Sequence, residues 1–232
     1  PSIGMGRYPD PEKIGCENVL LAAVHGNTAG NPSGNLDVAG ALKHQAYLDE
    51  QGKILDTFYD SVLFCPSNSF PFTSDAKANA DLYRADMFTE GMNLYAWDGA
   101  AKLVQEAIPG TADATVWLNL MCPKNELTCP DLNGDGKNED FSTAEGRLAF
   151  LKYQVDEYLK AWEEAGFENI TLLGFYWNNE YIDKTNLAME KVVIGGINEY
   201  IHEKGFKSFW CPYYTANGIW MWQELGFDGA VM

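Results

Sequence analysis

The chain has 232 residues, is 46% hydrophobic and carries a formal charge of −17, from 33 acidic and 16 basic side chains. This length and composition allow one sizeable core, so we expect a single domain over residues 1–232. So acidic a surface repels nucleic acid and anionic membranes, and it is typical of a secreted or extracytoplasmic protein. No apolar run approaches the about 20 residues needed to cross a bilayer, so we expect no membrane span.

Short apolar runs alternate with longer amphipathic stretches along the chain. The runs predicted as strands are residues 18–25, 61–68, 114–123, 170–180, 207–215 and 228–232, and the predicted helices are 93–107, 143–165 and 185–203. The strands are hydrophobic almost throughout, which indicates a parallel sheet covered on both faces.

The helix over residues 143–165 has the clearest start and stop signals. Ser142 and Glu145 form a capping-box pattern, and Gly166 follows as the stop. Arg147 lies on this helix, and we expect it to pair with a nearby carboxylate.

Repeated strand and helix alternation predicts an α/β fold, either a (β/α)8 TIM-barrel-like domain or an open doubly wound sheet. Residues 26–31 lack the G-x-G-x-x-G spacing of a dinucleotide-binding sheet, which favours the barrel. A full barrel needs eight strands, and the chain stops at the sixth. We therefore expect an incomplete barrel with about six of the eight strand and helix units.

The fourth predicted strand runs directly into Asn178, Asn179 and Glu180. In a parallel barrel, the carboxyl ends of the strands face the active-site mouth, so Glu180 is a candidate catalytic group. The alternative is a rim glutamate that pairs with a lysine or caps the next helix. A setting enclosed by Trp177 and Tyr181 would suit a carboxyl group that donates a proton.

An acidic loop over residues 131–142 places Asp131, Asn133 and Asp135 at alternate positions, with a glycine at the sixth. This is the first half of an EF-hand-type calcium loop, although Ser142 replaces the glutamate at position twelve. We expect Lys137 and Asp140 in the ligand set as well, although Glu139, water or another group can supply the ligand that Ser142 lacks. We predict a structural calcium ion here; the alternative is a solvated acidic turn.

The five cysteines include one pair that is close in sequence, Cys122 and Cys129, across a proline-containing loop. The sequence is compatible with either a disulfide between these two cysteines or two free thiols. Cys65 and Cys211 lie in apolar strand-like runs, where we expect small buried thiols.

Three segments, GFYWNNE (174–180), FWCPYYTANG (209–218) and LGFDGAVM (225–232), resemble a family of bacterial domains of unknown function, DUF4855. The resemblance covers most of the chain from about Val19 onward and includes the acidic loop with Arg147. It implies a glycosidase-type TIM barrel in extracytoplasmic, carbohydrate-related proteins, with no assigned reaction. It also implies that the last strand normally continues, so the chain looks truncated.

The pair Asn179-Glu180 is also similar to the Asn-Glu pair that ends the fourth strand in a large clan of retaining glycosidases with TIM-barrel folds. This similarity implies Glu180 as general acid/base and Asn179 as the residue that holds a sugar hydroxyl. The clan's nucleophilic carboxylate lies on the seventh strand, which this chain does not reach.

We therefore expect a glycoside hydrolase-like domain that cleaves a polysaccharide or glycan. The alternatives are a non-catalytic carbohydrate-binding barrel and a calcium-stabilised scaffold. Residues expected to contact the carbohydrate are Asn179, His25, Asn119, Trp177, Tyr213 and Tyr214. His25 can equally be structural, Trp177 can belong to the core, and we expect one of the two tyrosines to face the site while the other packs against a helix.

Overall fold

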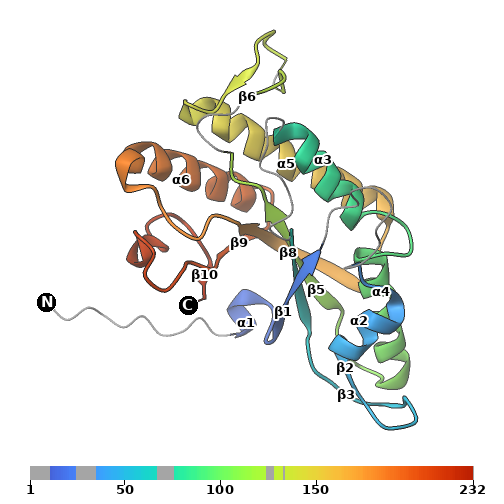
Figure 1. Ribbon diagram of the computed structural model, residues 1–232. Coiled ribbons are helices and arrows are strands. Elements are labelled where there is room, and N and C mark those ends of the chain that lie inside the picture. The colour runs from blue at the N-terminus through green and yellow to red at the C-terminus, as the bar shows by residue number, and fades with distance from the viewer. Residues whose placement is uncertain (1–10, 25–34, 67–75, 124–127, 133, 232) are drawn as a thin grey trace, which may run out of the picture.

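The computed structural model describes residues 11–24, 35–66, 76–123, 128–132 and 134–231 (Figure 1). Its centre is a six-stranded sheet with the order β1-β4-β5-β8-β9-β10, in which every neighbouring pair is parallel. The strands are β1 (Val19–Val24), β4 (Ser61–Pro66), β5 (Ala114–Leu120), β8 (Ile170–Trp177), β9 (Lys207–Trp210) and β10 (Gly229–Ala230). All six predicted strands are confirmed, although most of them are shorter than predicted.

Helices cover the outer face of the curled sheet, as Figure 1 shows. They are α2 (Val38–Gln45), α3 (Ala76–Met87), α4 (Leu94–Ala107), α5 (Ala144–Ala165) and α6 (Leu187–Glu203), while the short α1 (Pro11–Ile14) lies beside β1. The helices predicted for α4, α5 and α6 are confirmed. The cap of α5 is Thr143 rather than Ser142, because the Thr143 hydroxyl accepts the hydrogen bond from Gly146 N.

The predicted (β/α)8 barrel is wrong for this chain. The six strands form a curled half-barrel, and strands and helices do not alternate one by one. A hairpin of β2 (Ala46–Leu48) and β3 (Ile54–Thr57) follows α2, both α3 and α4 lie between β4 and β5, and a hairpin of β6 (Thr128–Cys129) and β7 (Glu139–Asp140) precedes α5. In the described part of the chain, two short 3-10 helices occur, η1 (Lys184–Asn186) before α6 and η2 (Ile219–Met221) between β9 and β10. Apolar runs predict buried parallel strands, but they specify neither the number of strands nor closure of the sheet.

The two faces of the sheet bury different sets of side chains. Val62, Phe64, Leu118 and Phe175 join the main core under the helices. The alternate residues of the same strands point to the other face, which we call the concave face. Its apolar floor consists of Cys16, Leu63, Trp117, Tyr176 and Phe209. The Phe209 ring centroid lies 5.4 Å from that of Trp117 and 5.8 Å from that of Tyr176.

Candidate functional site

The carboxyl ends of β4 and β5 are held apart by a tyrosine from α3. The buried Tyr83 hydroxyl donates to Phe64 O at 2.7 Å and accepts from Asn119 N at 3.0 Å. The paired register of β4 and β5 ends at Phe64 and Leu118, where this hydroxyl takes over the backbone groups. Because both buried groups keep a partner, the strands can part at Asn119 without leaving the backbone unsatisfied.

Other helix and strand side chains fix the chain beyond the strand ends. Fully buried Gln154 accepts from Met121 N at 2.8 Å and donates to Met121 O at 3.0 Å. Trp210 Nε1 donates to Asn179 O at 2.8 Å, which ties the end of β8 to β9. The loops that follow β8 and β9 are joined by hydrogen bonds from Tyr213 N to Glu180 O and from Ile182 N to Asn217 O. These contacts position the candidate residues at one edge of the sheet.

Glu180 lies exposed in the loop just beyond β8. Among the salt bridges and side-chain hydrogen bonds of the described residues, none involves its carboxylate. Its electrostatic neighbours are two thiols and a phenol: burial first, and then the Glu180 charge, raise the pKa of Cys65 to about 11. Burial and then Glu180 also raise the pKa of Cys211. Glu180 therefore lies near Cys65 and Cys211, which pack against the apolar floor of the concave face.

Trp177 does not enclose Glu180 as expected. Its side chain is 2% exposed and belongs to the core under the helices, on the opposite face of the sheet from Tyr176. Tyr181 is 55% exposed. The expected setting with Glu180 between these two rings is therefore not formed, and Trp177 offers no open ring face for a ligand.

Asn119 and Asn178 meet on the concave face. Asn119 follows Trp117 by two residues on β5, so both side chains point to the same side of the sheet. Asn178 Nδ2 donates to Asn119 Oδ1 at 2.8 Å. Asn119 is fully buried, and its Nδ2 has no hydrogen-bond partner among the residues that the structure describes. Asn179 is half-buried, and the contact that fixes it is the one from Trp210 to its backbone oxygen.

Tyr213 and Tyr214 are both exposed, at 51% and 74%. The expectation that one of them packs against a helix is wrong, because β9 ends at Trp210 and both tyrosines follow it in a loop. Their ring centroids lie 4.7 Å apart. Two further exposed aromatic side chains, Tyr181 and Trp220, come from the same two loops. His25 lies outside the described residues.

The dipeptide Cys-Pro occurs four times in the sequence, and three of the four lie at this edge, whereas Cys129-Pro130 belongs to the β6 hairpin. Cys65-Pro66, Cys122-Pro123 and Cys211-Pro212 end or follow β4, β5 and β9. Proline has no N–H to donate to a neighbouring strand, so a proline near each strand end disfavours further extension of the ladder. Cys122 is a free thiol, so the disulfide considered with Cys129 is not formed. Burial raises the pKa of Cys122 to about 12.

The acidic loop is folded on itself. Asp131 accepts from Gly134 N at 2.7 Å and from Gly136 N at 2.8 Å, and Asp135 accepts from Lys137 N at 2.9 Å. Asp140 belongs to β7, and hydrogen bonds from Ser142 lower its pKa. Asn133 lies outside the described residues, within which no group of three or more His, Cys, Asp or Glu side chains could hold a metal ion. The calcium site stays a prediction.

Arg147 pairs with a carboxylate, as predicted, and the structure identifies that carboxylate as Glu190 on α6. The two side chains are 3% exposed each, and Nη1 lies 2.5 Å from Oε1. Arg147 Nε and Glu190 Oε2 have no hydrogen-bond partner. This ion pair joins α5 to α6 near Cys122, on the helix side of the site.

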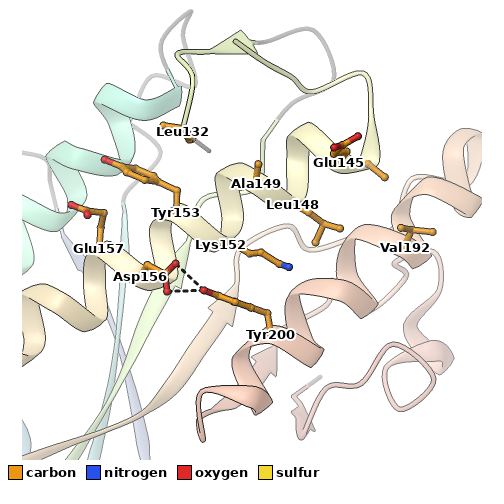
Figure 2. A pocket seen from close by; sticks show the side chains of 11 residues that line it. Leu132, Glu145, Leu148, Ala149, Lys152, Tyr153, Asp156, Glu157, Val192 and Tyr200 are labelled. Atoms are coloured by element: carbon orange, nitrogen blue, oxygen red, sulfur yellow. Dashed lines mark hydrogen bonds between the residues drawn. The ribbon is translucent and has the colours of Figure 1, made fainter. Parts of the chain in front are cut away.

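A separate groove of about 860 Å³ lies on the outer side of the molecule between α5 and α6 (Figure 2). Its polar groups pair with one another or with neighbours: the Tyr200 hydroxyl donates to both oxygens of Asp156 at 2.8 Å, and Tyr153 donates to Asp81 at 2.8 Å. It contains none of the predicted carbohydrate-binding residues. We therefore place the candidate site at the carboxyl edge of the concave face.

Comparisons with known proteins identify the family and no activity. Residues 31–232 match the model of the family described as "Domain of unknown function (DUF4855)", so the chain belongs to this family. No curated protein and no solved structure matches the chain. Among the described residues, no helix is long and apolar enough to cross a membrane.

Proposed function

We propose that this member of the DUF4855 family is a secreted, glycoside hydrolase-like domain that cleaves a polysaccharide or glycan, with Glu180 as general acid/base. The observation that supports it is the placement of Glu180: an exposed carboxylate at the carboxyl edge of parallel strands, with no ion pair among the described residues. Structural glutamates at such an edge usually pair with a cation or cap a helix. An unpaired one is available to a ligand.

Exposed aromatic side chains beside Glu180 support carbohydrate as the ligand. Tyr213 and Tyr214 lie in the loop that is hydrogen-bonded to Glu180 O, and both side chains are exposed, so a sugar ring can contact them. Asn119, Asn178 and Asn179 bring amides to the same edge.

General acid catalysis requires the Glu180 carboxyl group to protonate the glycosidic oxygen while a second carboxylate acts on the sugar from about 5 Å or about 6.5–9.5 Å away. The electrostatic partners of Glu180 in the described part of the chain are thiols and a phenol, namely Cys65, Cys211 and Tyr176. This neighbourhood favours a second candidate function, a non-catalytic carbohydrate-binding domain that uses the same amides and tyrosines.

A glycan-hydrolysis screen with matched variants separates the two functions. We expect the parent protein to release sugars from one class of glycan, and Glu180→Gln to lower the rate by at least about 100-fold. Glu199→Gln is the control, because Glu199 is exposed on α6, away from the strand ends. Equal activity of parent and Glu180→Gln would contradict the catalytic role. Binding without cleavage would select the carbohydrate-binding function, and neither binding nor cleavage would reject both.

We also propose a structural calcium ion in the acidic loop, held by Asp131, Asn133, Asp135, Asp140 and the backbone of Lys137. The alternate oxygen side chains and the left-handed Gly134 and Gly136 (φ 78° and 85°) support it. We expect a chelator to lower the Tm and added calcium to restore it. Asp131→Asn keeps an oxygen for the turn but removes the charge, and it should abolish this response. A parent Tm that ignores both chelator and calcium would contradict the proposal.

A further inference from the structure

The hydrogen bond between Asn178 and Asn119 orients the Asn178 amide. Its Nδ2 points inward to Asn119 Oδ1 at 2.8 Å, and the Cys65 thiol also lies 4.0 Å from that same oxygen. In this arrangement the Asn178 amide N–H and the Cys65 S–H both donate to Asn119 Oδ1. Asn178 is half-buried, its Oδ1 accepts no hydrogen bond from the described residues, and this atom is not among the fully buried polar atoms without a partner, so it is open to a ligand. Asn178 therefore presents a fixed acceptor.

Tyr176 presents a donor on the same face. It precedes Asn178 by two residues, and its ring is 3% exposed against Phe209. Its hydroxyl makes no hydrogen bond within the described part of the chain. Burial first, then the nearby groups Cys65, Cys211, Glu180 and Cys122, raise the pKa of Tyr176 well above its ordinary value. The phenol therefore stays protonated and can donate a hydrogen bond.

The buried Asn119 side chain lowers the stability of the folded protein in a way that packing alone does not explain. Its fully buried Nδ2 lacks a partner, and a buried donor without an acceptor destabilises the folded protein. An apolar side chain of similar size would avoid this. Buried unsatisfied groups in native proteins call for a specific explanation, often a functional one. Orientation of Asn178 is an explanation that the observed hydrogen bond supports.

We propose that Tyr176 and Asn178 form a donor and acceptor pair that holds sugar hydroxyls beside Glu180, and that Asn119 is the positioning residue for Asn178. A hydroxyl both accepts and donates, so one hydroxyl or a vicinal pair satisfies both groups. A carboxylate would meet two acceptors, Asn178 Oδ1 and Glu180, and be disfavoured. The site thus selects neutral glycans with free hydroxyls. This inference rests on the proposed function, since it names the subsite of that same site.

Calorimetric binding in a Glu180→Gln background tests the contact pair without turnover. The probes are the hexasaccharides of cellulose, xylan, mannan and chitin, with hexagalacturonate as the anionic arm. We expect Tyr176→Phe and Asn178→Ala each to weaken the Kd of the bound neutral probe at least tenfold. Tyr200→Phe is the matched control, because it deletes a hydroxyl whose partner is Asp156 on the outer groove (Figure 2), and it should leave the Kd unchanged.

The positioning role of Asn119 is tested with a matched buried asparagine. Asn119→Ala should weaken binding as Asn178→Ala does, yet keep the Tm within about a degree of the background protein, because it also removes the unsatisfied Nδ2. Asn198→Ala deletes the same atoms at a structural position, where Nδ2 donates to Leu225 O at 2.7 Å. It should lower the Tm by several degrees and leave the Kd unchanged.

The outcomes distinguish this inference from the proposed function. A neutral probe bound equally by the background protein, Tyr176→Phe and Asn178→Ala would overturn the contact pair and leave the carbohydrate function standing. A Tm loss in Asn119→Ala as large as in Asn198→Ala, with unchanged binding, would make Asn119 structural. Binding of hexagalacturonate alone would overturn the selection of neutral glycans, and binding of none of the probes would reject both proposals.

Discussion

Two carboxylates, Asp60 and Glu180, lie at opposite ends of the same parallel sheet and have opposite surroundings. Asp60 immediately precedes β4, and its two oxygens accept from Glu17 N at 2.8 Å and Asn18 N at 2.7 Å. Nearby, Lys207 at the start of β9 donates to Ile14 O at 2.8 Å. The charged groups at the amino end therefore tie the segment around α1 to the base of the sheet.

Glu180 at the carboxyl end contributes no comparable tie. Its carboxylate makes no salt bridge in the described chain, and the polar groups beside it include the unpartnered Asn119 Nδ2. Under the proposed function, this difference separates stability from ligand binding within one sheet: the charges at the amino end hold the fold, and the polar groups at the carboxyl end are available to a ligand. Substitutions at the two ends should therefore affect different measurements.

The largest expected effect on stability comes from the buried ion pair of Arg147 and Glu190, which lies near the carboxyl end but which we expect to serve stability rather than ligand binding. Both side chains are buried, so Arg147→Met leaves an uncompensated buried charge. We expect the free energy of unfolding to fall by about 3–5 kcal/mol, measured by denaturant titration. The double variant Arg147→Met, Glu190→Leu should recover most of the loss.

The exposed pair Lys191 and Glu224 is the control for this ion pair. Lys191→Met should change the free energy of unfolding by less than about 1 kcal/mol. If Arg147→Met kept full stability but lost glycan binding, Arg147 would serve ligand binding at the carboxyl end of the sheet rather than the stability of the fold.

A smaller effect is expected at the amino end. Asp60→Ala removes the acceptor of two backbone N–H groups and should lower the free energy of unfolding by about 2 kcal/mol, with the Kd for glycan unchanged. Asp60→Asn keeps one oxygen acceptor and should lose about half as much. A weaker Kd in Asp60→Ala, at temperatures where the protein is fully folded, would contradict the separation of the two ends.

The sequence was sufficient to predict the sheet, because its strands are continuous apolar runs such as residues 61–65 and 114–118. It did not predict the half-barrel, since curvature and closure depend on the stagger between strands rather than on any one strand. Helix α3 was missed although Ala76, Ala80, Tyr83 and Met87 recur at helical spacing and are all buried. Short apolar side chains and several charges weakened that pattern.

The candidate site was only partly predictable because β8 contains a bulge. The register between β5 and β8 shifts after Val116, so that Leu172 and Phe175 face the same core although they are three residues apart. Strict alternation from Leu172 would have placed Trp177 on the concave face; the bulge places Tyr176 and Asn178 there. Gly174 permits it, since a Cβ at this position would lie 1.9 Å from Lys207 O.

The smallest expected effect is the pH dependence contributed by the thiols of the carboxyl edge. Burial raises the pKa of Cys65 from 9.0 to about 11 and that of Cys122 from 9.0 to about 12. Above pH 9 the unfolded chain releases thiol protons that the folded protein keeps, so the free energy of unfolding falls as the pH rises toward 11.

Each thiol should lower the free energy of unfolding by an amount on the order of 1 kcal/mol between pH 8 and pH 10.5. The measurement is denaturant titration at both pH values, and the loss in the parent is compared with the loss in Cys65→Ala or Cys122→Ala. Tyrosines and lysines titrate in the same range, but they are common to both proteins and cancel in that difference.

Cys65 lies beside Glu180, whereas Cys122 lies near Arg147 and Glu190. A neutral ligand bound at the concave face should displace water from the Cys65 thiol but not from the Cys122 thiol. It should therefore increase the pH-dependent loss of unfolding free energy that is due to Cys65 and leave the loss that is due to Cys122 unchanged. An equal response of the two thiols would place the ligand elsewhere.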